Sequence, residues 1–120
     1  MVFTIEIVRK GSEHAVVETV VHEGRDAPAW TEEDVAIVLK EILGAIDRAA
    51  NPGADQRPVA LRGFSWIVEP TDDQVVVAIE IPSGAAVAGP FDIDQAHLSQ
   101  MITRVIEDAG ASLPGSSRVH

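Results

Sequence analysis

Residues 2–22, VFTIEIVRKGSEHAVVETVVH, contain two runs of β-forming residues separated by a turn. In the first run, every second residue from Phe3 to Ile7 is large and apolar, which is the period of two expected of a strand with one buried face. The turn residues KGS follow at 10–12, and the second run, residues 15–22, is rich in β-branched side chains. This stretch therefore predicts a β-hairpin.

A helix is predicted after the hairpin, and its start is marked by PAWTEEDV at residues 28–35. Thr31 is a favourable N-cap, and the three acids that follow it occupy the first turn, where the helix dipole favours negative charge. Asn51-Pro52-Gly53 ends the helix. Between these signals, apolar residues recur at helical spacing. They are Val35, Val38, Leu39, Ile42, Ile46 and Ala49.

A second hairpin is indicated after a connector at residues 51–58 that contains Pro and Gly. Residues 59–70 and 74–81 have the composition of strands, and the turn TDD lies between them at 71–73. The small-residue stretch PSGAAVAGP, residues 82–90, is interpreted as a loop.

Pairing Glu69 with Gln74 across this turn aligns the two strands, because paired residue numbers have a constant sum in an antiparallel ladder. Trp66 then lies opposite Val77. The residues on this face of the hairpin are all apolar, so we expect the face to pack under the helices. They are Phe64, Trp66, Val68, Val75, Val77 and Ile79.

The last helix is predicted to begin at Asp92 or Asp94 and to end before Gly110. One side of it is apolar, carrying Leu98, Met101, Ile102, Val105, Ile106 and Ala109. The final residues, 111–120, offer little to bury and are expected to form a disordered tail.

The order of elements predicts an α+β fold of the form ββαββα within a single domain at residues 1–110. We expect a two-layer arrangement in which two helices pack on one face of a four-stranded antiparallel sheet. A shift of sixty residues lays one half on the other, placing Ile7 on Ile67 and Asp34 on Asp94. This match suggests an internal duplication of a ββα unit. Chance agreement is the alternative, because Ala, Val and Ile are abundant.

Composition restricts the classes of partner. The 120 residues fit one domain, and the chain is acidic, with a formal net charge of −10. Such a surface repels a phosphate backbone, so no nucleic-acid partner is expected. No apolar stretch approaches the ~20 residues needed to cross a bilayer, so no membrane partner is expected either. The chain lacks cysteine and shows no secretory signal, and we expect a cytoplasmic location.

The stretch DIDQAH, residues 92–97, brings two aspartates and a histidine within six positions as candidate metal ligands. Asp94 and His97 are three residues apart and could share an ion. However, acids at a helix start also accept hydrogen bonds from free backbone N–H groups, and the other three histidines lie in a turn, at a strand end and in the tail. We therefore interpret Asp94 and His97 as weak candidates and predict capping, with no metal and no cofactor.

No catalytic motif is present: GxSxG, HExxH, GxGxxG and a P-loop lysine are all missing from the sequence. An enzyme is therefore unsupported. Our first functional hypothesis is a non-enzymatic module that acts by association, either as a homodimer or with another protein. The alternative is a small-molecule-binding domain or small enzyme with a pocket near residues 82–97, between the predicted loop and the last helix.

The side of the sheet away from the helices is expected to carry more aliphatic residues than a solvated surface requires. Such a patch favours a homodimer through the sheet face or an edge strand, burying roughly 1,200 Å² or more in total. The aliphatic residues predicted there are Val8, Val16, Val20, Ile67, Val76 and Ala78, interrupted by Glu6, Glu18 and Glu80.

Overall fold

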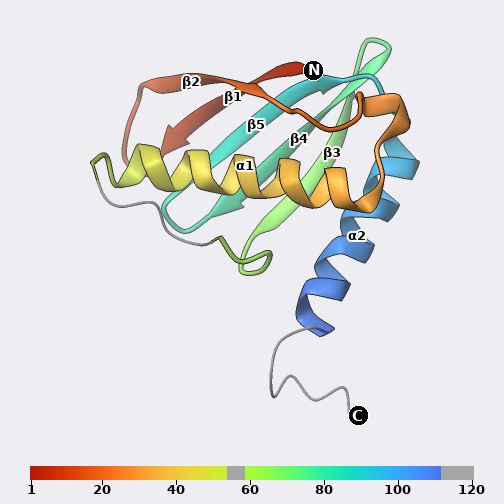
Figure 1. Cartoon of the computed structure of the whole chain (residues 1–120). Helices are drawn as coiled ribbons and strands as arrows, with labels where there is room; N and C mark the ends of the chain where they lie inside the picture. The colour runs from red at the N-terminus through yellow and green to blue at the C-terminus, as the bar shows by residue number, and fades with distance from the viewer. Residues whose placement is uncertain (54–58, 112–120) are drawn as a thin grey trace.

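A computed structural model describes residues 1–53 and 59–111 of the chain. In chain order, the elements are β1 (Val2–Arg9), β2 (Ala15–Val21), the 3-10 helix η1 (Ala27–Ala29), α1 (Glu32–Ala50), β3 (Ser65–Thr71), β4 (Gln74–Ile81), β5 (Gly84–Phe91) and α2 (Gln95–Ala111). Figure 1 shows α1 lying across one face of the sheet, with α2 beside its N-terminal end. The fold is α+β, as predicted.

The sheet has five antiparallel strands in the order β2-β1-β5-β4-β3, so the prediction of four strands is wrong. The missed strand is β5, which lies in the middle of the sheet although its sequence, GAAVAGPF, is poor in β-forming residues. Its position explains its stability, because hydrogen-bonded ladders to β1 and β4 override weak intrinsic propensity. Ala86 and Ala88 are buried on the helix side, where α1 packs over β5.

Gly84 and Pro90 are residues uncommon in strands, and each fits its position in β5. A Cβ atom at Gly84 would lie 2.7 Å from the Val8 carbonyl oxygen, so only glycine permits the close approach of β1 and β5 at this point. Pro90 cannot donate a ladder hydrogen bond, and it lies beside a register irregularity between Val75 and Val77 of β4. Proline is tolerated within sheets at such irregularities.

The fifth strand also bears on the predicted duplication. The first half of the chain folds as ββα and the second as βββα, and the structure does not confirm a repeated ββα unit. Gly24 lies in the connector before α1, whereas Gly84, sixty residues later, begins a strand. Equal spacing therefore does not give these two glycines equivalent places in the fold.

The second hairpin forms as predicted, but its register differs by two residues. Thr71 pairs with Gln74, and Trp66 lies opposite Ile79 instead of Val77. A shift of two leaves every side chain on its predicted face, because the side-chain period is also two. Val77 and Ile79 are buried, whereas Phe64 and Trp66 are only partly buried because β3 is an edge strand.

The core lies between the sheet and the two helices. The inner face of β1 contributes Phe3, Ile5 and Ile7, and both helices contribute their predicted apolar sides. Its largest fully buried side chains include Phe91, Leu39, Ile42, Ile46, Leu98 and Ile102. Both helices therefore pack as their apolar spacing predicted.

The prediction that Val16, Glu18 and Val20 lie on the side of the sheet away from the helices is wrong. Val16, Glu18 and Val20 pair with inward-facing residues of β1, so they lie on the helix side of the sheet. Consistent with this, Glu18 accepts a hydrogen bond of 2.8 Å from Arg48 of α1. The surface opposite α1, which we call the open face, carries Glu6, Val8, Val17, Thr19, Ile67, Val76, Ala78, Glu80 and Val87.

Within residues 1–53 and 59–111, no helix is long and apolar enough to cross a membrane. The last helix continues to Ala111, one residue beyond the predicted domain end. The rest of the predicted tail, residues 112–120, lies outside the described residues.

Candidate functional site

Of the two candidate metal ligands at the start of α2, the Asp94 side chain binds the backbone of His97. The Asp94 carboxylate accepts a 2.9 Å hydrogen bond from the backbone N–H of His97, and the Asp94 carbonyl accepts one of 3.0 Å from Leu98. Asp94 is therefore the N-cap of α2. In the described part of the chain, no three His, Asp or Glu side chains are grouped closely enough to hold a metal ion.

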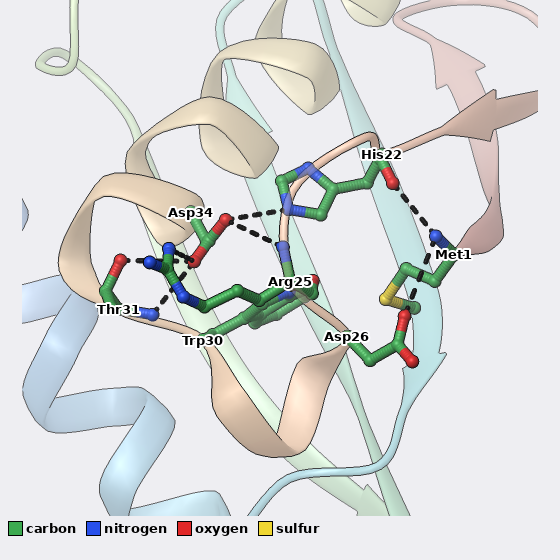
Figure 2. A network of polar contacts seen from close by, with 7 residues as sticks. All are labelled: Met1, His22, Arg25, Asp26, Trp30, Thr31 and Asp34. Carbon is green, nitrogen blue, oxygen red and sulfur yellow. Dashed lines mark hydrogen bonds and ion pairs between the residues drawn. The ribbon is translucent and has the colours of Figure 1, made fainter.

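A buried polar cluster lies at the start of α1 instead, and Figure 2 shows its members converging on the Asp34 carboxylate. His22 follows β2, Arg25 lies in the connector, Thr31 is the N-cap of α1 and Asp34 belongs to its first turn. Asp34 Oδ1 lies 3.1 Å from His22 Nε2 and accepts a 3.2 Å bond from the Arg25 backbone N–H. Because an ionised carboxylate only accepts, His22 Nε2 carries a hydrogen.

The second carboxylate oxygen is equally well satisfied. Asp34 Oδ2 accepts hydrogen bonds from the backbone N–H and hydroxyl of Thr31, both at 3.1 Å, and from the Arg25 guanidinium at 3.3 Å. Burial acts to raise the pKa of Asp34, since its side chain is almost excluded from water. The hydrogen bonds from Thr31, Arg25 and His22 outweigh burial and hold the pKa well below its ordinary value.

Neighbouring groups pack closely against the His22 and Asp34 side chains. The rings of Trp30 and His22 are nearly perpendicular with their centroids 5.8 Å apart, and the Trp30 indole N–H donates to the Arg25 carbonyl at 2.8 Å. A Cβ atom at Gly24 would overlap with the Asp34 carboxylate and lie 2.6 Å from His22 Nε2. The His22–Asp34 pair therefore serves to fasten the connector between β2 and α1.

The pKa of Asp34 predicts how the stability of the protein depends on pH. A carboxyl group with a lowered pKa in the folded state stabilises the fold fully above its unfolded-state pKa, about 3.9, and loses that contribution as the pH falls. We expect Asp34→Asn to unfold more easily than the wild type at pH 7, and this difference to shrink steadily below about pH 4. Urea titrations of both proteins at pH 7, 4 and 3 measure it. A difference that stays constant to pH 3 would contradict the proposed charge contribution.

Part of this cluster could be read from the sequence. Thr31 and Asp34 have the spacing of a capping box, and the backbone N–H of the N-cap does bond to the acid at the third helical position. The involvement of His22 was missed, because no local pattern places a strand-end histidine against a helix that begins ten residues later.

A groove lies at one end of the sheet, where the β1–β2 turn, the β4–β5 turn and the start of β3 meet. It is open to solvent and has a volume of about 900 Å³. Its lining residues are Val8, Arg9, Lys10, Gly11, Ser12, Gly63, Phe64, Ser65, Glu80, Ile81, Pro82, Gly84 and Ala85.

This groove overlaps only partly with the pocket predicted near residues 82–97. Pro82, Gly84 and Ala85 line it. However, residues 84–91 form a strand, and α2 begins beyond the opposite end of that strand. The predicted combination of a loop and a helix start is therefore not found, since the intervening chain is extended.

The edge strand β2 exposes unpaired backbone groups. In an antiparallel ladder, pairs of residues that bond to each other alternate with pairs whose backbone groups point away from the partner strand. Met1 and His22 exchange hydrogen bonds of 2.8 and 2.9 Å, so they are a bonded pair and every second residue of β2 from His22 bonds to β1. By this alternation, Val17, Thr19 and Val21 direct their N–H and C=O groups away from β1. Their side chains are exposed, with Val17 60% and Val21 65% accessible. This edge has no proline and a single charged residue, Glu18.

The opposite edge strand, β3, is protected. Gln95 of α2 donates a 2.9 Å hydrogen bond to the Val68 carbonyl, which shows that this carbonyl points away from β4. By the same alternation the backbone nitrogen of Pro70 also faces the free edge, where proline has no hydrogen to donate. Within residues 1–53 and 59–111 the two edges of the sheet therefore differ, because no other segment hydrogen-bonds to the free edge of β2, whereas Gln95 and Pro70 restrict pairing at β3.

Comparison with protein-family models, curated proteins and solved structures gave no match for this chain. The function is therefore inferred from the surface features of the structure. In the described part of the chain, the β2 edge and the groove both present polar groups without a hydrogen-bond or ion-pair partner, and we take them as the candidate binding surfaces.

Proposed function

We propose that the protein works by association with a second copy of itself, through antiparallel pairing of β2 with β2 of the partner. The observation that supports this is the contrast between the two edges of the sheet. An exposed, valine-rich edge without proline is a template for another strand, and natural proteins usually block such edges. Here β3 is blocked and β2 is not.

A two-fold axis perpendicular to the sheet makes β2 antiparallel to its own copy. If the axis lies midway between Val17 and the same residue of the second copy, or between Thr19 and its copy, residues with outward-facing N–H and C=O groups lie opposite one another. Three such residue pairs form about six hydrogen bonds. This placement also keeps Glu18 away from the partner's Glu18, which matters because like charges directly opposite are destabilising. Glu18 is already paired with Arg48 on the helix side.

The open face is a less suitable interface than the β2 edge. Its aliphatic residues are interrupted by Glu6 and Glu80, and no described basic side chain lies within ion-pair distance of either. Stacking the face on its copy would bury these carboxylates without a partner, at a cost that can exceed the apolar gain. Edge pairing leaves both glutamates in water.

Val17→Pro tests this proposal selectively. The Val17 N–H does not bond to β1, so proline removes a donor needed only by the dimer, and an edge strand tolerates proline at such a position. We expect a wild-type dimer, a folded Val17→Pro monomer, and a dimer for Val17→Ala, which keeps the N–H. Size-exclusion chromatography with light scattering measures the mass, and circular dichroism checks the fold.

A second variant distinguishes the edge from the open face. The double substitution Ile67→Lys and Val76→Lys places two charges on the open face and should leave a β2-edge dimer intact. A monomeric double variant together with a dimeric Val17→Pro would place the interface on the open face. A wild type that stays monomeric at high concentration would overturn the association proposal altogether.

A further inference from the structure

We propose that the groove at the β1–β2 turn binds an amphipathic organic anion, a molecule with one carboxylate and an apolar body. This inference is independent of the proposed dimer, because no residue of β2 lines the groove. The size is appropriate, since small-molecule sites in proteins occupy about 300–1,000 Å³ and are lined mainly by apolar groups with a few polar ones.

The apolar part of the site comes from three separate segments. On the helix side of the sheet end, Ile81 ends β4, Pro82 follows it in the β4–β5 turn and Phe64 precedes β3. Val8 and Ala85, paired on β1 and β5, line the groove from the open-face side. Phe64 is only partly buried, so part of its ring remains free to contact a ligand. Gly84 pairs with both Arg9 and Ile81 and leaves the floor between them without a side chain. An alkyl chain fits this surface by displacing water from it.

The charge of the site is unusual for this protein. The chain has a net charge of −10, yet Arg9 and Lys10 are adjacent on one wall of the groove. In the described residues, Arg25, Arg48 and Arg104 form ion pairs, whereas Arg9, Lys10, Lys40 and Arg62 form none, and of these four only Arg9 and Lys10 line the groove. Strand alternation places the Arg9 side chain on the helix side, in line with Ile5 and Ile7 and beside Gly84 and Ile81, where its guanidinium can bind a carboxylate through two parallel hydrogen bonds.

The residues beyond Arg9 favour an uncharged body. On the helix side of the sheet end, Arg9 pairs with Gly84 and Gly84 with Ile81, and Phe64 lies at the start of β3, so no charged side chain follows Arg9 in this row. Glu80 lies on the open face, and a second carboxylate placed beside Ile81 and Phe64 would lose its hydration without a cation to pair with. The groove therefore suits a monocarboxylate with a hydrocarbon chain better than a dicarboxylate or a phosphate-rich molecule.

Decanoate, kept below its micelle concentration, is the probe for this site. Isothermal titration should show saturable binding of decanoate and much weaker binding of decanol and of acetate, which lack the charge and the apolar body respectively. In ¹⁵N-labelled protein, the amide shifts should concentrate at residues 8–12, 63–65 and 80–85.

Paired variants separate a specific charge contact from net charge. Arg9→Gln with Lys10→Gln should weaken decanoate binding about tenfold or more, as expected on loss of charge-assisted hydrogen bonds. The control, Lys40→Gln with Arg104→Gln, changes net charge equally on the helices and should leave the affinity within about twofold, because exposed distant charges are screened. Equal binding of decanol and decanoate, equal losses in both double variants, or no saturable binding of decanoate would each overturn the proposal.

Discussion

Asp34→Ala is expected to lower the free energy of unfolding by about 3–5 kcal/mol, the range found when one member of a buried ionic network is removed. Asp34 is 3% exposed and satisfies the His22 ring, the Arg25 and Thr31 backbone N–H groups and the Thr31 hydroxyl. Alanine leaves the buried His22 ring without its acceptor and also removes the acceptor of the partly buried Arg25 and Thr31 groups. Urea unfolding followed by circular dichroism at pH 7 measures the loss.

Asp94→Ala is the matched control, because Asp94 also lies at a helix start but is exposed to solvent. Loss of this N-cap should reduce stability by only about 1 kcal/mol. If the two substitutions had equal effects, Asp34 would be an ordinary cap and the buried network would contribute nothing further. The contrast also tests whether positions sixty residues apart are physically equivalent.

Phe91→Ala is expected to destabilise the protein by about 3–5 kcal/mol, as for a large aromatic side chain in a packed core. Phe91 is fully buried at the end of β5, with its ring centroid 5.1 Å from that of Phe3 and 4.9 Å from that of Trp30. Its removal leaves a cavity between β1, β5 and the connector. Denaturant titration of the variant measures the loss.

Ile67→Ala provides the comparison for this prediction, since Ile67 lies on the open face and is 55% exposed. Its truncation should cost less than about 1 kcal/mol, as is usual for surface substitutions. A loss below 1 kcal/mol for Phe91→Ala would show that residues 84–91 do not form a central strand packed under α1. The comparison therefore tests the strand that sequence patterns did not predict.

The candidate binding surfaces were only partly predictable. The excess of aliphatic residues on β1 and β2 is visible in the sequence, and it led to the expectation of a homodimer. Which residues of β2 face outward depends on its register with β1, and the predicted set contained Val16 and Val20 instead of Val17. The groove was not predictable in this place, because Arg9, Phe64 and Pro82 are brought together only by the pairing of strands distant in the sequence.

Local interactions by themselves determined the first hairpin, both helices and their capping residues. The alternation of apolar residues in β1, the Thr31 N-cap and the apolar stripe of α1 act over a few residues, so their patterns are complete within short segments. Tertiary structure alone decided that residues 84–91 form the central strand. Their small side chains have little intrinsic strand preference, and they are held by ladders to β1 and β4 and by the helix packed over them. The same holds for His22 and Asp34, whose contact exists because the chain turns back between β2 and α1 and excludes water from both side chains.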